Sequence, residues 1–195
     1  MAPELPKLHC FFARNDVICI TAKNNQDITN LKVLIVTNSI TVKPIGVIHS
    51  SLKESQGAPI QPVFAQDSEG VIEIYEPYRQ ALKDLEGFER IWLLYWFHKV
   101  VEYKPLVKPY LDTVERGLFA TRAPCRPNPI GMSPVRLNRI EDGKIYISDV
   151  DILDGTPLID IKPYFSKFDK FEVKKHGWYD QVSGQKGIAD KRFEK

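Results

Sequence analysis

Residues 135–150, VRLNRIEDGKIYISDV, decide the predicted fold. Two segments that alternate apolar and polar residues, Val135–Ile140 and Lys144–Val150, flank the pair Asp142-Gly143. An Asp-Gly pair between such segments is a strong signal for a β-hairpin, because the common two-residue hairpin turn needs positive φ at both positions. The sequence therefore predicts two antiparallel strands here.

Further strands are predicted on the N-terminal side of this hairpin. Val42–Ser50 and Val71–Tyr75 are β-type segments, separated by a loop at Gln56–Asp67 that contains two prolines. Ile91–Val101 is a nearly continuous apolar and aromatic run, too short and too aromatic for a membrane helix. We expect it to form a central strand that is buried on both faces.

One helix is predicted between these strands. It opens at Glu76-Pro77, carries Tyr78, Ala81, Leu82 and Leu85 on one face, and stops at Gly87. One or two short helices among six or so strands favour a mainly β, barrel-like fold over repeated βαβ units. The sequence also has no GxGxxG, P-loop, GxSxG or HExxH motif, so a Rossmann-type methyltransferase is not expected.

Composition narrows the class of protein. The 195 residues are 43% hydrophobic and 27% charged, as in soluble globular proteins, and the length suits one domain. No apolar run approaches the roughly 20 residues that cross a bilayer, and the N-terminus lacks the order of a signal peptide. We therefore expect a cytoplasmic protein that makes no membrane contact. The net charge of +2 means that any RNA binding must use a local patch.

Cysteine and histidine are too sparse for a metal or disulfide framework. The three cysteines include no CxxC pair, and the four histidines are scattered. We expect reduced thiols and no bound metal.

The first forty residues differ from the rest. Two short apolar pieces, Val17–Ile20 and Leu31–Val36, surround a polar stretch. They are compatible with an added hairpin, a poorly ordered leader, or translated sequence upstream of the functional start. We therefore divide the chain into an N-terminal extension (1–40), a β-barrel domain (41–180) and a C-terminal tail (181–195).

A stiff, arginine-rich segment precedes the predicted hairpin. Ala120–Ser133 reads ATRAPCRPNPIGMS, in which three prolines fix φ and keep the loop extended, while Gly131 permits a close approach of backbone or ligand. From Arg116 to Arg139 every charged residue is an arginine, which suits bidentate recognition of phosphate or carboxylate. A rigid connection with solvated arginines is the alternative.

An acidic segment follows the hairpin. Asp149–Tyr164 reads DVDILDGTPLIDIKPY and crowds four aspartates, which repel one another unless something compensates their charge. A calcium loop is disfavoured because the spacing of the aspartates misses the required pattern by one residue. The arginine-rich segment or a cationic ligand such as a sulfonium would compensate them, and a turn with solvated aspartates remains an alternative.

Three blocks of this sequence resemble a known family. KPIGVIHS (43–50), FATRAPCRPNPIGMS (119–133) and DILDGTPLIDIKPY (151–164) are similar to the signature blocks of the TsaA-like, or TrmO, tRNA methyltransferases. The resemblance implies an all-β, barrel-like domain that binds S-adenosyl-L-methionine and forms a homodimer. It further implies N6-methylation of N6-threonylcarbamoyladenosine beside the anticodon of tRNA.

The resemblance also implies the residues that contact the cofactor. Matched motif by motif, they are Gln61, Pro62, Val63, His98, Lys99, Arg122, Met132, Leu153, Asp154, Gly155 and Thr156.

Methyl transfer to this nitrogen suggests further roles. The nitrogen belongs to a urea and should lose its proton during transfer, so a general base is expected, with Asp154 and Tyr164 as candidates. Arg126, between two prolines at the tip of the stiff loop, is predicted to bind RNA, together with Arg116 and Lys162. A non-catalytic RNA- or nucleotide-binding β-module and a metal-dependent hydrolase are the competing functions.

Overall fold

The computed structural model describes residues 8–13, 16–21, 32–36, 40–100, 102–182 and 187–194. The chain divides into two compact units, Met1–Val42 and Lys43–Lys195. The first unit contains one antiparallel sheet in the order β1-β2-β3, and its strands are β1 (Leu8–Ala13), β2 (Asp16–Thr21) and β3 (Lys32–Val36). The two apolar pieces of the N-terminal forty residues thus overlap β2 and β3. The proposed role of this unit as an extension stays a prediction.

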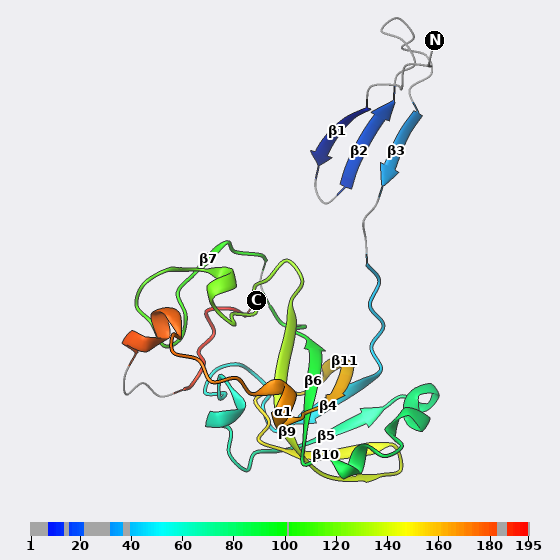
Figure 1. Ribbon diagram of the computed structural model, residues 1–195, viewed down its shortest axis with the longest axis vertical. Coiled ribbons are helices and arrows are strands. Elements are labelled where there is room, and N and C mark those ends of the chain that lie inside the picture. Colours follow the sequence, from blue (N-terminus) through cyan, green and yellow to red (C-terminus); the bar gives the residue numbers. More distant parts are fainter. Residues whose placement is uncertain are drawn as a thin grey trace, which may run out of the picture. The chain divides into compact units, whose positions relative to one another are not determined.

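The second unit is a closed six-stranded barrel with the strand order β10-β5-β4-β11-β6-β9, so the predicted mainly β, barrel-like class is confirmed (Figure 1). Its neighbouring strands are antiparallel. The strands are β4 (Gly46–Ser50), β5 (Glu69–Ile74), β6 (Arg90–Trp96), β9 (Ile130–Glu141), β10 (Lys144–Ser148) and β11 (Thr156–Pro163).

The strands of the barrel bury one face each, because alternate side chains of a strand point to opposite faces. In β6, Ile91, Leu93 and Tyr95 are buried, whereas Trp92 and Leu94 are partly exposed. The expectation of a strand buried on both faces is therefore wrong, since a barrel strand has an inner and an outer face. The strand also ends at Trp96 rather than at residue 101. The core is completed by Ile48, Ile72, Ile74, Val135, Leu137, Ile145, Ile147, Val150, Ile152 and Leu158.

The predicted hairpin is confirmed. Strands β9 and β10 pair with Glu141 opposite Lys144, which leaves Asp142 and Gly143 as the two turn residues. Their φ angles are 49° and 75°, as the favoured hairpin turn requires. Strand β9 begins earlier than expected, at Ile130, so the last residues of the stiff segment already belong to the barrel.

The predicted helix is instead two short 3₁₀ turns, η3 (Glu76–Leu82) and η4 (Leu85–Gly87). Asp84 adopts a left-handed conformation with φ of 66° and interrupts the helical path, which explains the difference. The expected apolar face is present in part. Tyr78, Leu82 and Leu85 pack against the barrel core, but Ala81 is exposed.

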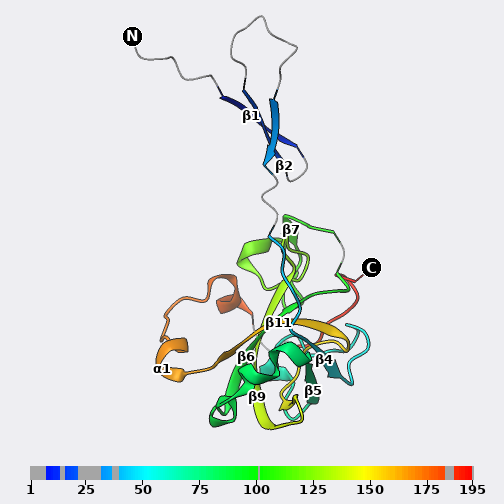
Figure 2. The ribbon, with the colours of Figure 1, turned by 90° about the vertical axis from the view of Figure 1, so that its right-hand side faces the viewer.

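Long connections cover one end of the barrel. The chain between β6 and β9 contains the short strands β7 (Leu106–Val107) and β8 (Arg116–Gly117), and both views place this region beyond the ends of β6 and β9 (Figures 1 and 2). The C-terminal residues return to it, since Ala189 exchanges backbone hydrogen bonds with Ala58 and with Gly57. A small second core forms there from Val107, Leu118, Ala123, Cys125 and Phe193.

The remaining elements are single turns. They are η2 (Pro62–Phe64), η5 (Leu118–Ala120), α1 (Ser166–Asp169) and η6 (Gly177–Gln181).

Candidate active site

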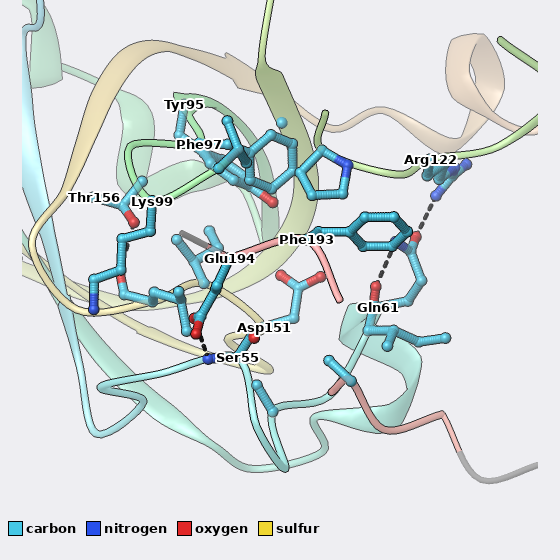
Figure 3. A pocket seen from close by; sticks show the side chains of 18 of the residues that line it. Ser55, Gln61, Tyr95, Phe97, Lys99, Arg122, Asp151, Thr156, Phe193 and Glu194 are labelled. Atoms are coloured by element: carbon cyan, nitrogen blue, oxygen red, sulfur yellow. Dashed lines mark hydrogen bonds between the residues drawn. The ribbon is translucent and has the colours of Figure 1, made fainter. Parts of the chain in front are cut away.

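A cleft of about 320 Å³ opens at the covered end of the barrel (Figure 3). Six parts of the chain meet around it: residues 55–61, the end of β6 with residues 97–100, Tyr110, the arginine-rich segment with the start of β9, residues 151–156, and the C-terminal residues 189–194. We call it the first cleft. Its lining combines apolar and aromatic side chains with a few polar groups, as small-molecule sites do.

The first cleft brings together many of the residues predicted to contact the cofactor. They are Gln61, His98, Lys99, Arg122, Met132, Leu153 and Thr156. Arg126, predicted to bind RNA, also lines it.

A second cavity of about 730 Å³, the aromatic cleft, borders the first. The predicted cofactor residues Pro62 and Val63 line this cavity rather than the first cleft. Gln61 and Arg122 line both cavities. Arg122 Nη1 donates a hydrogen bond to Gln61 Oε1. The aromatic residues of the second cavity are Phe64, Tyr110, Phe119, Trp178, Tyr179 and Phe193.

His98 lies in the first cleft. Its Nδ1 is 3.3 Å from Oγ1 of Thr156, which joins the end of β6 to the start of β11. Burial, helped by the positive charge of Lys99, lowers the pKa of His98. The lowered pKa favours the neutral imidazole, which is suited to hydrogen bonding rather than to ion pairing.

Asp151 is a cleft residue that the sequence-based site did not include. Its Oδ1 is buried and, within the described part of the chain, has no hydrogen-bond partner. Burial raises the pKa of Asp151 to about 6, against the opposing effects of the Ser133 side chain and the Arg122 charge. The hydroxyl of Tyr95, which pairs with Ser133 Oγ at 3.1 Å, lies in the same neighbourhood.

Asp154 does not line the first cleft. Its Oδ2 forms an ion pair of 2.7 Å with Lys53 Nζ, and its Oδ1 accepts a hydrogen bond of 3.2 Å from the Ser50 amide. His49 Nδ1 is 3.6 Å from the same carboxylate. The Lys53 contact holds the pKa of Asp154 below its usual range. These residues belong to a separate depression, the outer groove, lined by His49, Ser50, Ser51, Lys53, Glu69, Gly70, Val71, Asn138, Arg139, Tyr146, Ile147 and Asp154.

Gly155 and Tyr164 also lie away from the first cleft. Gly155 has φ of 74°, and its amide donates to the Ile48 carbonyl, so it forms the turn that brings β11 beside β4. The ring of Tyr164 lies 5.8 Å from that of Trp92, beyond the end of β11. The roles predicted for Asp154, Gly155 and Tyr164 stay predictions.

The crowded aspartates are compensated in different ways. Asp149 pairs with Arg90 at 2.6 Å and lies 3.9 Å from Arg136 of the arginine-rich segment. Asp160 pairs with Lys162 at 2.8 Å, near the exposed end of β11. The arginine-rich segment was one of the expected partners, but for Asp149 it supplies only the more distant Arg136, and the close partner is Arg90 of β6. The sequence drew attention to all four aspartates of the acidic segment, but it could not indicate which of them faces the first cleft.

Both predicted RNA-binding arginines lie over aromatic rings that line the aromatic cleft. The guanidinium carbon of Arg116 is 5.9 Å from the centre of the Trp178 ring, and that of Arg126 is 5.5 Å from the Phe119 ring. Arg116 also pairs with Asp112 at 2.7 Å. Lys162 pairs with Asp160 on β11 and lines neither the first cleft nor the aromatic cleft.

Among the residues that the structure describes, no helix has the length and apolar character to span a membrane. Within the same residues, His, Cys, Asp and Glu side chains form no group of three or more that could hold a metal ion.

A closed β-barrel with a partly apolar cleft at one end defines a small ligand-binding β-barrel protein. The family model described as tRNA-methyltransferase O N-terminal domain matches residues 47–170, and the chain belongs to this TrmO family.

Individual relatives agree with this assignment. A Pyrococcus abyssi protein named "Probable S-adenosyl-L-methionine-binding protein" is 49% identical over 142 residues, 73% of this chain and 77% of that protein. The "tRNA (adenine(37)-N6)-methyltransferase" of Mus musculus is 37% identical over 67% of this chain, but the match spans only 32% of the mouse protein. The crystal structure of TrmO from Pseudomonas aeruginosa is 38% identical with a TM-score of 0.62, and the match covers 73% of this chain and 62% of that one.

Proposed function

We propose that this protein binds S-adenosyl-L-methionine in the first cleft and methylates N6 of a modified adenosine beside the anticodon of tRNA. The observation that supports this proposal most directly is the first cleft of a TrmO-family barrel, where Gln61, His98, Arg122 and Thr156 converge from separate segments. The names of the relatives, an S-adenosyl-L-methionine-binding protein and a tRNA (adenine(37)-N6)-methyltransferase, support the same activity.

The first cleft fits such a cofactor in size and chemistry. Its volume of about 320 Å³ lies within the range of about 300–1,000 Å³ typical of small-molecule sites. Arg122 is suited to the carboxylate of a methionine moiety, because a guanidinium offers two parallel donors. Met132, Phe97 and Ile152 supply apolar surface. When bound, the cofactor supplies a methyl group on a positively charged sulfur.

Catalysis by this chain would depend mainly on alignment. Methyl transfer is an in-line displacement, so holding the acceptor nitrogen in line with the methyl carbon and sulfur lowers the barrier. The tight contact of Gly131 with Tyr95 contributes rigidity, since a side chain at position 131 would begin only 2.2 Å from the Tyr95 ring. We propose N6-threonylcarbamoyladenosine as the substrate, in agreement with the family resemblance.

We propose that the aromatic cleft and its arginines receive the anticodon loop. Unpaired bases stack on exposed aromatic rings, and arginines contact phosphates or stack on bases. Phe119 is 76% exposed, with Arg126 over it, and the Trp178 ring faces Arg116. Arg126→Ala should therefore weaken tRNA binding and make it less salt-dependent, with a smaller effect on cofactor affinity, because Arg126 also lines the first cleft. Filter binding at several salt concentrations beside calorimetry measures both.

We further propose a cytoplasmic homodimer. The support for dimerisation is an exposed apolar stretch after β11, where Phe168 and Phe171 are 73% and 79% exposed and Phe165 and Val173 are also exposed. Apolar patches of this kind often mark protein–protein contacts. Sedimentation at tens of micromolar should show a dimer, and Phe168→Asp with Phe171→Asp should give a monomer. A wild-type monomer at that concentration contradicts the proposal.

The deciding experiment measures cofactor binding and methyl transfer separately. Calorimetry should detect S-adenosyl-L-methionine binding, and millimolar cofactor should raise the melting temperature, because only the folded state binds it. Nucleosides from tRNA treated with the protein and cofactor should then show the mass increase of one methyl group. RNA binding with no transfer would instead indicate a non-catalytic β-module, and absence of cofactor binding would overturn the proposed function.

A further inference from the structure

Among the residues that line the first cleft, Asp151 and Glu194 are the two carboxylates. Glu194 has a structural partner, because its Oε1 accepts a hydrogen bond of 2.6 Å from the Ser55 amide. Asp151 differs, since its buried Oδ1 has no hydrogen-bond partner among the described residues. Figure 3 shows both side chains in the cleft. Buried polar atoms without a partner are uncommon, and each calls for an explanation.

The surroundings of Asp151 raise its pKa but leave its carboxylate mostly ionised at neutral pH. The other titratable or charged groups that line the cleft are Tyr95, His98, Lys99, Tyr110, Arg122, Arg126 and Glu194. Burial raises the pKa of Asp151 to about 6, and the Ser133 side chain and, to a smaller extent, the Arg122 charge limit the rise. Such a group is mostly ionised at pH 7 and still binds a proton readily, as an effective general base must.

We propose that Asp151 is the general base of the methyl transfer and takes the N6 proton of the substrate on its carboxylate. This inference rests on the proposed function. In the balanced step, the N6–H electron pair remains on nitrogen while the proton passes to Asp151. The new N6–CH₃ bond forms as the S–CH₃ bond breaks, and the sulfur leaves as a neutral thioether. The unmet hydrogen-bonding capacity of Oδ1 then serves to hold the proton.

The other candidates are placed less well for this step. The Asp154 carboxylate is occupied by Lys53 and the Ser50 amide in the outer groove. The Tyr164 phenol lies beside Trp92 and lines neither cavity. Tyr95 faces the first cleft, but burial raises its pKa, so it keeps its proton at neutral pH.

The first test compares Asp151→Asn with the wild type in single-turnover methylation at saturating cofactor and tRNA. The wild-type rate should rise through about pH 6 with a slope of one proton and then level off. The variant should be about 10²–10⁴-fold slower at pH 7.5 and should lose this rise. Asp142→Asn is the matched control, because Asp142 lies in the β9–β10 turn, where asparagine tolerates the positive φ. It should methylate at the wild-type rate.

Two further measurements do not depend on turnover. In the wild type, the ¹³C carboxyl resonance of Asp151 should titrate near pH 6, and a titration below pH 4 would overturn the inference. By calorimetry, Asp151→Asn should bind S-adenosyl-L-methionine and its thioether product with affinities within threefold of the wild type. A selective loss of affinity for the positively charged cofactor would instead make Asp151 a cation-binding residue.

The outcomes separate this inference from the proposed function. If the wild type methylates tRNA and a folded Asp151→Asn keeps more than a third of its rate, the base assignment is wrong while the function stands. If the wild type does not methylate tRNA, the proposed function fails first, although the carboxyl titration still reports on Asp151. Asp151→Glu, which keeps the carboxylate, should recover part of the rate together with a pH-dependent rise.

Discussion

The first cleft and the outer groove hold two aspartates only three residues apart, and the pKa of Asp151 is raised whereas that of Asp154 is lowered. In the outer groove Asp154 has an ammonium partner at 2.7 Å and a backbone donor at 3.2 Å. In the first cleft, Asp151 has a buried oxygen without a partner among the described residues. The acidic segment therefore serves two purposes along one short stretch: one carboxylate fixes a turn to β4, and the other is left reactive.

This difference indicates which carboxylates hold the fold and which are available for chemistry. Charged groups that stabilise a fold are compensated, whereas perturbed and uncompensated groups cluster at functional sites. Asp149 provides a third, compensated case, since Arg90 donates to its Oδ2 and the Asp67 amide to its Oδ1. If the comparison holds, changing a compensated aspartate should affect stability, and changing Asp151 should affect catalysis.

The largest stability effect is expected at Asp149. Asp149→Asn keeps the size of the side chain and suits its φ of 63°, so it removes the charge opposite Arg90 with little other change. Removing the charge of the buried Asp149 leaves Arg90, whose side chain is 30% exposed, without its ion-pair partner, and we expect a loss of about 2–3 kcal/mol. Urea unfolding at pH 7 measures it. A loss of unfolding free energy below about 1 kcal/mol would show that the ion pair of Asp149 does not stabilise the fold, and would contradict the comparison.

A smaller effect is expected at the wall of the first cleft. Gly131→Ala would place a Cβ 2.2 Å from the Tyr95 ring, so the ring must move toward the cleft or the strands must separate. We expect a destabilisation of about 1–3 kcal/mol from overpacking, together with weaker cofactor binding. Gly117→Ala is the matched control, because a Cβ there meets nothing within 4 Å and φ is −55°. Equal melting temperatures and cofactor affinities for both variants would contradict the prediction.

The parts of the fold that sequence predicted correctly are those set by local chemistry. The β9–β10 turn follows from Asp142-Gly143 alone, and the mainly β class follows from the number of short apolar segments. The one-sided burial of β6 depends on barrel closure through β9 and β11, which no local pattern reveals. The helix prediction placed the start at Glu76 correctly, but it did not anticipate the 3₁₀ geometry or the left-handed Asp84 that divides the segment in two.

The candidate site was predictable in outline from its motif blocks. Residues such as His98, Arg122 and Thr156 do converge in one cleft. Asp151 was not singled out, because its orientation depends on tertiary contacts. The Ser50 hydroxyl donates to the Ile152 carbonyl at 2.7 Å, and the left-handed Asp149 turns the chain just before it. The sequence shows that several aspartates are close together, but it does not show which of them these tertiary contacts direct into the first cleft.

The pH dependence of stability tests the raised pKa of Asp151. Its pKa is about 6 in the folded protein and about 3.9 in the unfolded chain, so the folded state binds more protons between these values. The contribution of Asp151 is therefore favourable below about pH 4 and is lost as the pH rises through 6. Asp151→Asn should be more stable than the wild type by about 1–2 kcal/mol at pH 7, with a smaller difference at pH 4. Parallel urea curves at the two pH values would show whether the gap narrows, and a wild type that is the more stable protein at pH 7 would contradict the prediction.

The smallest effect is expected at Asp154, and it tests the comparison most directly. The Lys53 and Asp154 side chains are 70% and 30% exposed, so solvent screens their ion pair. The pKa of Asp154 is lowered in the folded protein, so its contribution is present at neutral pH and is lost as the pH falls through that pKa. Asp154→Asn should cost less than about 1 kcal/mol at pH 7, and half-molar salt should reduce this further. Because the Asp154 carboxylate points to Lys53, the single-turnover rate at saturating cofactor and tRNA should stay within about threefold of the wild type and keep its rise near pH 6. A 100-fold loss of rate with unchanged stability would make Asp154 the general base, as one of the two sequence-based candidates has it, and would reverse the roles of the two carboxylates.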